Sequence, residues 1–478
     1  MKQLNASSHA TVNRPVKIMQ FGEGNFLRAF VDWIVQDLND KKVINSNVVV
    51  VQPVPMGRVA DLARQDGLYT LCLEGIDGGK TVQSREIIDV LADFINPYED
   101  YGKYLSYARS SDLEVIISNT TEAGIVLDET DVDFLKCPKS FPGKLLSFLY
   151  ERYIFFKGDV SKGLAIIPCE LIDHNGETLK SVLIELAKIR NMDEDFLNWL
   201  VTANHFTDTL VDRIVPGYPR DTVEKIWEET GFTDNNVVKG EVFHLWVLKK
   251  EPFVESKLPA DKSGLNVIFA EDITPYKQRK VKILNGAHTS MVPVAYLCGL
   301  DTVGEALADA DVGQFIREII FDEIKPTIDL PQDEMESFAN SVLERFQNPF
   351  IRHELLSIAL NSTTKFTTRL LPSYNDYLAR FGKTPTHILF AFAALVAFHK
   401  GKRGKEAIKI QDDEKYIQFW REVWSNKGYT NIAKAALSNT DAWQQDLATK
   451  ENVKLVAGYI KDIETLGMRK ALRAFLNA

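Results

Sequence analysis

Cysteine is scarce in this sequence, and no two cysteines stand at the CxxC spacing of a redox or zinc motif. The chain has 478 residues and only four cysteines, which are scattered along it: Cys72, Cys137, Cys169 and Cys298. This pattern argues against a disulfide framework and against a zinc knuckle. A reducing, cytoplasmic compartment fits it best, and we expect no metal cofactor because the histidines and cysteines form no ligand-like cluster in the sequence.

Long hydrophobic runs are also missing. The longest apolar stretch, "ILFAFAALVAF" at residues 388–398, falls well short of the roughly 18 residues that a membrane span needs. The N-terminal stretch "MKQLNASSHATVNRP" lacks the apolar core of a secretory signal. We therefore expect no membrane association, and we predict that residues 388–398 form a buried helix.

No block of consecutive lysines and arginines is present. The sequence holds 56 lysines and arginines against 66 aspartates and glutamates, a net charge of −10. A nucleic-acid footprint or a polybasic membrane anchor is therefore not supported. Small molecules are the expected partners.

The order of sequence patterns predicts two domains. Strand-like apolar runs alternate with helix-like segments in the first half, for example "VKIMQF", "NVVVV", "EVIIS" and "LAIIP", which is typical of an α/β fold with a doubly wound parallel sheet. From about residue 266 onward, segments of 3.6-residue periodicity dominate. We predict an α/β domain over residues 1–265 and a mostly helical domain over residues 266–478.

The segment "FGEGNFLRAF" carries glycines directly after the first predicted strand. Gly22 and Gly24 permit a tight turn and a close approach of backbone N–H groups to a pyrophosphate at a helix N-terminus. Leu27 stands where a third glycine is usual, so two turn glycines that merely lead into a helix explain the segment too. Its place in the first strand-to-helix turn favours a dinucleotide site.

The end of the second predicted strand lacks the acid that usually binds the ribose hydroxyls of NAD. Gln52 and Pro53 stand there instead, and Arg58 nearby would suit a 2′-phosphate. These residues leave the choice between NAD and NADP open.

The segment "KVKILNGAH", residues 280–288, places three polar side chains in apolar surroundings. On an α-helix Asn285 lies roughly 140° and His288 roughly 80° from Lys280, so all three fit one broad face. A lysine in an apolar pocket suits proton transfer, the asparagine amide can donate to an oxygen that gains negative charge, and the histidine can orient either partner. Alternatively, Lys280 and Lys282 are solvated, Asn285 precedes a kink and His288 is a core residue.

Several longer motifs occur in the order expected of one enzyme family. They are "GEGNFLRAF", "QDGLYTL", "SNTTEAG", "HNGETL", "LVDRIVP" and "KVKILNGAH", and the sequence resembles, from about residue 16 to its end, the mannitol dehydrogenase family of long-chain polyol and sugar-acid dehydrogenases. The resemblance implies an NAD-dependent enzyme with a Rossmann-type first domain and a helical second domain. The family's catalytic lysine, asparagine and histidine fall on Lys280, Asn285 and His288, which favours Lys280 over Lys282.

The same motifs imply where the cofactor binds. The strand ends and turns that carry them contribute Phe21, Gly22, Gly24, Asn25, Phe26, Gln52, Asn119, Thr120, Thr121 and Glu122. Ligands collect at the carboxyl ends of the strands in such sheets. For Glu122, a helix-capping role is an equal alternative.

Departures from the family pattern bear on the substrate. Asp208 replaces a second oxyanion-binding asparagine, and Ser357 replaces an arginine that contacts substrate in polyol members, whereas Lys365 is kept. Lys250 replaces an aspartate, which would suit a substrate that carries a carboxylate. Arg213 is a further substrate-binding candidate, although an ion pair with its neighbour Asp212 explains it as well.

These observations predict an NAD-dependent oxidoreductase that acts on a CH–OH group of a sugar acid. It is expected to be a monomer or a small homo-oligomer. The alternatives are another sugar-acid or polyol specificity on the same scaffold, and a nucleotide-binding sensor that has lost catalysis.

Overall fold

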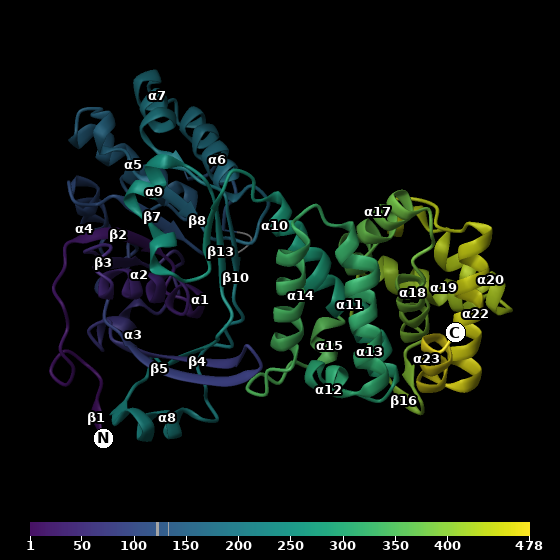
Figure 1. Cartoon of the computed structure of the whole chain (residues 1–478). Helices are drawn as coiled ribbons and strands as arrows, with labels where there is room; N and C mark the ends of the chain where they lie inside the picture. Colours follow the sequence, from purple (N-terminus) through teal and green to yellow (C-terminus); the bar gives the residue numbers. More distant parts are fainter. Residues whose placement is uncertain (121–123, 132) are drawn as a thin grey trace. The chain divides into compact units, whose positions relative to one another are not determined.

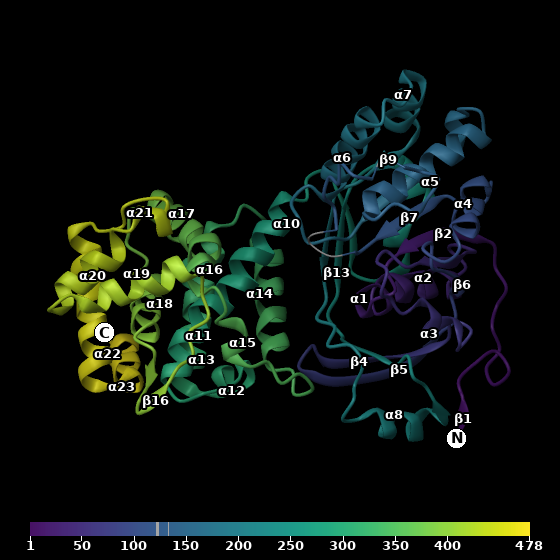
Figure 2. The same cartoon turned by 180° about the vertical axis from the view of Figure 1, so that it is seen from behind.

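The computed structural model of the chain describes residues 1–120, 124–131 and 133–478. It divides into two compact units. The first comprises Met1–Gly75 and Lys80–Ile273, and the second comprises Ile76–Gly79 and Thr274–Ala478 (Figures 1 and 2).

The first unit is built around a parallel sheet with the strand order β6-β3-β2-β7-β8-β9. These strands are β2 (Val16–Phe21), β3 (Asn47–Val51), β6 (Leu91–Ile95), β7 (Val115–Ser118), β8 (Ala165–Pro168) and β9 (His205–Phe206). The order runs outward in both directions from β2 and β7, as in a dinucleotide-binding Rossmann fold. The predicted α/β class and doubly wound sheet are thus confirmed.

Strand side chains alternate between two apolar cores. In β2, Ile18 belongs to one core and Met19 and Phe21 to the other, and in β3, Val48 and Val49 divide in the same way. Helix α2 (Val31–Asp40) covers one face, whereas α4 (Tyr101–Ser106), α5 (Phe141–Phe155), α6 (Asn175–Ile189) and α7 (Glu194–Ala203) cover the other. Because both faces are covered, the strands read as continuous apolar runs rather than alternating ones.

The helix that the sequence predicts after the glycine turn is broken in two. Helix α1 (Asn25–Arg28) ends before α2 begins, and Phe30 between them has φ −132° and ψ −75°. Side chains take the backbone carbonyls at the break: Tyr69 donates its hydroxyl to the Arg28 oxygen at 2.7 Å, and Arg213 donates to the Ala29 oxygen at 2.5 Å. These carbonyls are therefore bonded without a continuous helix.

Smaller sheets complete the first unit, and the sequence did not predict them. One has the order β12-β4-β5, another β10-β13-β14, and β1 pairs with β11. Strand β14 follows residue 265 and pairs with β13, so the first unit extends to Ile273. The bounds are β1 (Lys2–Gln3), β4 (Tyr69–Asp77), β5 (Lys80–Ile88), β10 (Thr209–Asp212), β11 (Phe232–Thr233), β12 (Val238–Glu241), β13 (Leu245–Lys249) and β14 (Val267–Ala270).

The remaining helices of the first unit are short. They are α3 (Val59–Ala63), η1 (Tyr107–Arg109), η2 (Val160–Lys162), α8 (Val223–Thr230), α9 (Pro252–Lys257) and η3 (Ala260–Ser263).

The second unit is mostly helical, as predicted. Its central helix α18 (Thr386–Phe398) is buried throughout residues 388–398, which confirms the buried helix expected there. The other helices are α10 (Thr274–Arg279), α11 (Gly286–Leu297), α12 (Val303–Ala308), α13 (Ala310–Glu318), η6 (Lys325–Thr327), α14 (Gln332–Phe346), α15 (Leu355–Ile358), α16 (Ser362–Arg369), α17 (Leu371–Phe381), α19 (Glu414–Ser425), α20 (Tyr429–Leu437), α21 (Thr440–Trp443), α22 (Lys450–Leu466) and α23 (Met468–Leu476). A small hairpin of β15 (Lys402–Arg403) and β16 (Glu406–Ala407) interrupts them.

Two turns of the second unit are π-helices, namely η4 (Lys280–Asn285) and η5 (Ile319–Ile324). An α-helix was expected from residue 280 onward, so this part of the prediction was wrong in helix type. Such π-turns are rare and often lie at functional sites.

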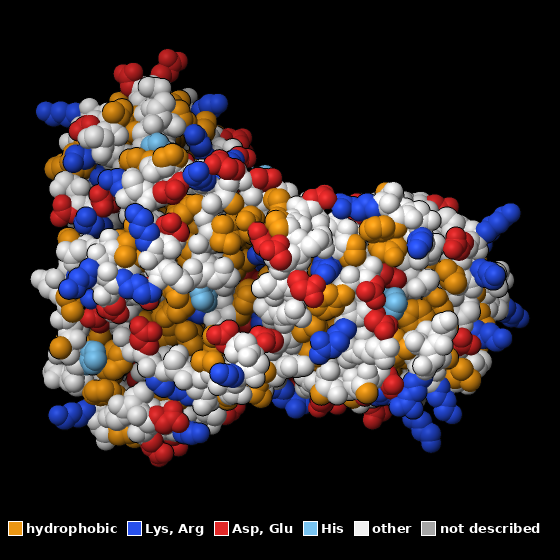
Figure 3. All heavy atoms as spheres, viewed as in Figure 1, with side chains coloured by type: hydrophobic (Ala, Val, Ile, Leu, Met, Phe, Trp, Pro, Cys, Tyr) orange, Lys and Arg blue, Asp and Glu red, His pale blue; other side chains and the backbone are white. Residues whose placement is uncertain are grey.

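Among the residues that the structure describes, no helix is long and apolar enough to cross a membrane. On the face viewed in Figure 3, basic and acidic side chains are interspersed.

Candidate active site

The glycine turn lies where the strand order of the main sheet reverses. Gly22 follows β2, donates its N–H to the Val51 oxygen at 3.0 Å and has φ +124°. A methyl group on Gly22 would lie 2.9 Å from the Asn119 oxygen, which follows β7. Glycine is therefore required for both backbone conformation and space.

Gly24 has a different role. Its φ of −67° is ordinary, and a methyl group there would meet no atom within 4 Å. A cavity of about 110 Å³ opens beside it, lined in part by Glu23, Asn25 and Arg28. The turn thus leaves room for a group to approach the backbone, and the residues present fit a dinucleotide pyrophosphate at this switch point.

Other residues proposed for the cofactor make contacts within the turns that follow β2 and β3. Asn25 accepts a bond from Arg28 at 2.7 Å, and the Phe26 ring stacks on Phe30. The Gln52 amide donates to the Val54 and Pro55 oxygens at 2.9 and 3.2 Å, which orders the loop after β3.

Asn119 and Thr120 bond across to the end of the next strand. Asn119 donates its side-chain amide to the Cys169 oxygen at 2.6 Å, and Thr120 donates its backbone N–H and hydroxyl to Glu170, both at 3.0 Å. Burial raises the pKa of Glu170, and these bonds partly offset that effect. Sequence reasoning missed Glu170 as the residue that ties β7 to β8; Thr121 and Glu122 lie outside the described residues.

Arg58, the residue that would suit the 2′-phosphate of NADP, is already paired with an acid. Its Nε lies 2.9 Å from Asp61, and its backbone N–H donates to the Glu23 side chain at 3.0 Å. A cation that already has a carboxylate partner is a weaker phosphate ligand. The structure therefore offers no specific feature for NADP at this position among the described residues.

In the second unit, η4 and α11 carry the trio singled out in the sequence. A π-helix closes its hydrogen bonds from residue i to i+5, so it needs more residues per turn than an α-helix. The fifth residue after Lys280 therefore comes round closer to Lys280 than the roughly 140° expected for an α-helix. Asn285 and His288 are three residues apart where α11 begins, which places them on one face.

Asn285 is half-buried, and its side-chain amide has no hydrogen-bond partner among the described residues. Its backbone oxygen accepts a bond from Thr289 at 2.8 Å. The amide is available to a ligand.

His288 is buried and packed between aromatic rings. It stacks on Phe346 with the ring centroids 4.4 Å apart, and it packs edge to face with His353, whose ring centroid lies 5.1 Å away. Burial, and then the charges of His353, Arg345, Arg369 and Lys365, lower the pKa of His288 well below its ordinary value. The ring is therefore neutral at pH 7, and its buried Nε2 atom has no hydrogen-bond partner within the described part of the chain.

Lys280 and Lys282 have different surroundings. Lys282 is buried, and its Nζ donates to Asp376 at 2.6 Å and to the Thr327 oxygen at 3.1 Å. It therefore anchors the π-turn to α17 and η6. Lys280 is half-buried.

The four side chains proposed for substrate lie in different settings. Lys365 is half-buried and donates to the Ile358 oxygen at 2.8 Å, whereas Lys250 is exposed and pairs with Glu271 at 2.9 Å. Arg213 is buried, bonds to backbone oxygens of Ala29, Val242 and Phe243, and lies over the Trp33 ring. It makes no ion pair with Asp212 or with any other described residue, so the ion pair that the sequence suggested is not formed. Because backbone oxygens already accept the hydrogen bonds of its guanidinium, we do not propose it as a substrate ligand.

Asp208 caps a helix. Its carboxylate accepts the backbone N–H groups of Gly176 and Glu177 at 2.9 and 3.0 Å, at the N-terminus of α6. Negative charge is favoured there. His174 begins this turn, and the buried amide of Asn175 bonds to backbone oxygens, so "HNG" is a turn.

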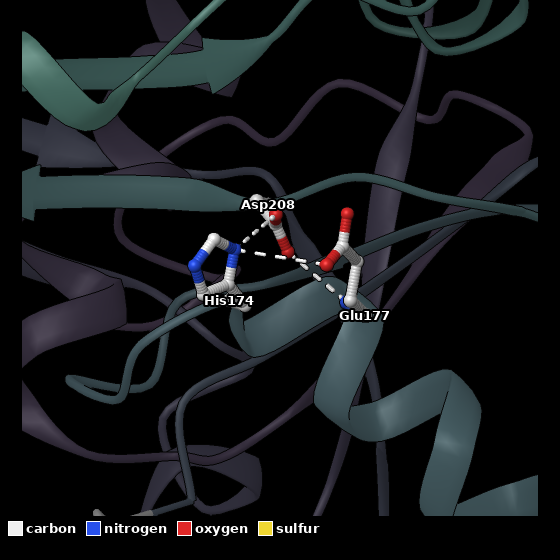
Figure 4. A group of neighbouring side chains, drawn as sticks. All are labelled: His174, Glu177 and Asp208. Atoms are coloured by element: carbon white, nitrogen blue, oxygen red, sulfur yellow. Dashed lines mark hydrogen bonds and ion pairs between the residues drawn. The ribbon is translucent and has the colours of Figure 1, made fainter.

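Asp208, His174 and Glu177 form the group within the described residues whose ligand atoms lie close enough to share a metal ion (Figure 4). The His174 and Glu177 side chains are exposed, and the Glu177 carboxylate lies 3.1 Å from the Lys249 amine. Helix capping and this ion pair already account for the arrangement, so it carries no metal assignment.

Sequence reasoning missed Arg369, which lies four residues after Lys365 on α16. The i, i+4 spacing of two cations in "KFTTR" was the available signal. Both side chains are half-buried.

Comparison with known proteins identifies the class. A model of the mannitol dehydrogenase Rossmann domain matches residues 16–262, and a model of the mannitol dehydrogenase C-terminal domain matches residues 272–466. The chain therefore belongs to the mannitol dehydrogenase family, a class of NAD-dependent oxidoreductases that act on CH–OH groups.

Within the family, the chain is similar to altronate oxidoreductases. It is 44% identical to the altronate oxidoreductase of Escherichia coli O6:K15:H31 and to that of Shigella flexneri, in each case over 99% of both chains. Among solved structures it matches a D-sorbitol dehydrogenase with a TM-score of 0.82 at 22% identity, over 99% of this chain and 100% of that one. It matches the Pseudomonas fluorescens mannitol 2-dehydrogenase complex with NAD and D-mannitol with a TM-score of 0.70 at 20% identity, over 97% and 95%.

Proposed function

We propose that this protein reduces D-tagaturonate to D-altronate with NADH, and catalyses the reverse reaction with NAD+. The observation that carries the proposal is the 44% identity to altronate oxidoreductases over 99% of the chain. The motif variants "SNTTEAGI", "IIPCELID" and "LNGAHT" support it, because they resemble tagaturonate reductase, another name for that enzyme. The substrate is then a small sugar acid, and the protein acts as a monomer or a small homo-oligomer.

The glycine turn would hold the dinucleotide. Gly22 and Gly24 give the backbone access to the pyrophosphate, while Gln52 and Asn119 order the neighbouring strand ends. Bound NADH supplies the hydride that reduces the ketone. The mannitol 2-dehydrogenase complex with NAD supports this choice of cofactor, as does the pairing of Arg58 with Asp61.

Lys280 is the proposed general acid of the reduction. Its ammonium group gives a proton to the carbonyl oxygen as the ketone becomes an alcohol, and its amine takes that proton back in the oxidation. The unengaged amide of Asn285 donates a hydrogen bond to the same oxygen as negative charge develops. His288, kept neutral by its surroundings, bonds a substrate hydroxyl or Lys280 through its unpartnered Nε2.

Replacement of Lys280 tests the mechanism. We expect Lys280→Ala to lower the turnover number at least about 100-fold, because general acid–base catalysis contributes 10²–10⁴. NADH binding, followed by fluorescence, should stay within twofold because the glycine turn is untouched. Lys470→Ala, at an exposed lysine of α23, is the control. More than a tenth of the wild-type rate in Lys280→Ala would rule out the assignment.

A substrate panel tests the specificity. NADH oxidation should be fastest with D-tagaturonate, slower with D-fructuronate and slowest with D-fructose, and NADPH should support less activity than NADH. A preference for fructuronate or fructose would assign the protein to another specificity of the same family. NADH binding without turnover of any ketose would indicate a sensor instead.

A further inference from the structure

Lys365 and Arg369 place two positive charges on one face of α16, beside the trio. They are four residues apart, which makes them neighbours on the helix surface. Helix α16 packs against the junction of η4 and α11, where a methyl group on Gly286 would lie 3.4 Å from the Arg369 oxygen. Lys365 lines a small cavity together with Thr289, the residue after His288.

Electrostatics support the same placement. The charges of Arg369 and Lys365 both act on the buried ring of His288, and each of the two lies close enough to the catalytic face to lower the pKa of that histidine. Burial and the neighbouring Arg369 also lower the pKa of Lys365. Positive charge therefore accumulates on the side of the site that α16 forms.

Arg369 has no acidic partner among the described residues. Its guanidinium makes no hydrogen bond or ion pair with any described residue, although the side chain is half-buried. The acid that attracts Lys365 is Asp412, which already accepts two bonds from Thr363. Two like charges at i, i+4 destabilise a helix, and burial without a counter-ion adds to that cost.

A half-buried arginine without an acidic partner among the described residues is suited to bind a carboxylate of a ligand. Its planar fork presents paired N–H donors that match the two oxygens of a carboxylate. The other cations are less suitable: Lys250 has Glu271 as its partner, and the Arg213 guanidinium is bonded to backbone oxygens. Ser357, where polyol members have an arginine, is exposed and bonds only to the Glu354 oxygen among described residues.

We propose that Arg369 binds the carboxylate of the substrate through its guanidinium fork, with Lys365 beside it, and thereby selects sugar acids over neutral ketoses. The proposal rests on the proposed function and names the residue that sets its substrate class. Arg369 is also the last residue of α16, where the helix dipole favours a cation. The test must therefore separate ligand binding from helix stabilisation.

Steady-state kinetics of Arg369→Gln and Arg369→Lys provide that separation. With D-tagaturonate, we expect the KM of Arg369→Gln to rise at least tenfold, while kcat/KM with the neutral ketose D-tagatose stays within twofold. Arg369→Lys keeps the charge at the helix end but loses the fork, so it should also lose selectivity for the acid. Arg421→Gln, at an exposed arginine of α19, is the matched control.

The outcomes are distinguishable. An unchanged ratio of kcat/KM for acid and neutral ketose in both variants would overturn the proposal, and so would equal losses on the two substrates. If Arg369→Gln fails to fold, as judged by Tm and by NADH binding, the ratio of kcat/KM for acid and neutral ketose in Arg369→Lys tests the proposal instead. A KM effect found in Lys250→Gln alone would assign the carboxylate to Lys250. Failure of the wild-type protein to reduce any sugar acid would refute the proposed function itself.

Discussion

Lys280 and Lys282 stand two positions apart in the sequence but have different environments in the fold. Lys282 anchors the π-turn through Asp376 and Thr327, whereas Lys280 is half-buried beside Asn285. Periodicity alone did not separate them, because the partner of Lys282 lies 94 residues away along the chain. The partners of a side chain, more than its type, determine its role in the fold.

Asp32 shows the same principle in the first unit. The residue is fully buried on α2, and its Oδ1 atom has no hydrogen-bond partner among the described residues. Burial raises its pKa from 3.8 to about 7, although Gln20, Arg28 and Tyr69 partly oppose the shift. The unfolded chain ionises this carboxyl at lower pH than the folded chain does, so the protein loses stability as pH rises from about 4 to about 7.

We therefore expect Asp32→Asn to raise the Tm at pH 8. The amide resembles the protonated acid in shape and carries no charge to bury, so the gain over wild type should be larger at pH 8 than at pH 5. Scanning calorimetry at both pH values measures it. Asp40→Asn, at an exposed position of the same helix, is the control. An equal Tm difference at the two pH values would contradict the assigned pKa shift.

Among the structural elements, the turn from β2 to α1 separates two uses of glycine. Gly22 serves the fold, since its φ of +124° and the nearby Asn119 oxygen exclude a side chain. Gly24 has an ordinary backbone conformation and open space around it. The GxG pattern indicated the turn, but only the backbone geometry assigns the two glycines different tasks.

This difference predicts different effects of the same substitution. Gly22→Ala should lower the Tm, because strain of this kind costs about 1–3 kcal/mol. Gly24→Ala should leave the Tm unchanged within about 1 °C but weaken NADH binding, because the methyl group would occupy the space that we assign to the pyrophosphate. Calorimetry and NADH fluorescence titration measure the two effects. Full NADH affinity in Gly24→Ala would place the pyrophosphate elsewhere.

The π-helix η4 is the element that sequence patterns could not identify. Its six residues have the apolar spacing of an ordinary helix, and the extra residue per turn is compatible with the same pattern. The bonds of Lys282 to η6 and α17 stabilise this turn from outside it. A feature that depends on such distant partners is not encoded in local periodicity.

As a whole, the protein consists of two units that each bury their own apolar core. The doubly wound parallel sheet and the helical second unit followed from alternation of apolar runs and from helical periodicity. The smaller sheets around β4 and β13 did not; the pairing of β12 with β4, for example, joins segments that are far apart in the sequence. The break between α1 and α2 likewise depends on Tyr69 and Arg213, which are distant in sequence.

Two compact units predict unfolding that is not two-state. We expect calorimetry to show two overlapping transitions. NADH at one hundred times its Kd should stabilise the first unit by about 2.7 kcal/mol and so raise the temperature of its transition. Hydrogen exchange identifies the protected unit. D-altronate should raise the other transition, because we assign its ligands to α16 and η4. A single transition with equal calorimetric and van't Hoff enthalpies would contradict this expectation.

The residue pattern was sufficient to predict the α/β class, the glycine turn and the helical second unit, because these features depend on periodicity and on short motifs, whereas the catalytic role of Lys280, Asn285 and His288 stays a prediction. The residue pattern could not predict which hydrogen-bond and ion-pair partners each polar side chain has in the fold. The carboxylate of Asp208 caps a helix, Arg213 bonds to backbone oxygens and Lys250 has an acidic neighbour, whereas Arg369 has no counter-ion among the described residues. Burial and partner choice arise from contacts between distant segments, and they are properties of the folded chain.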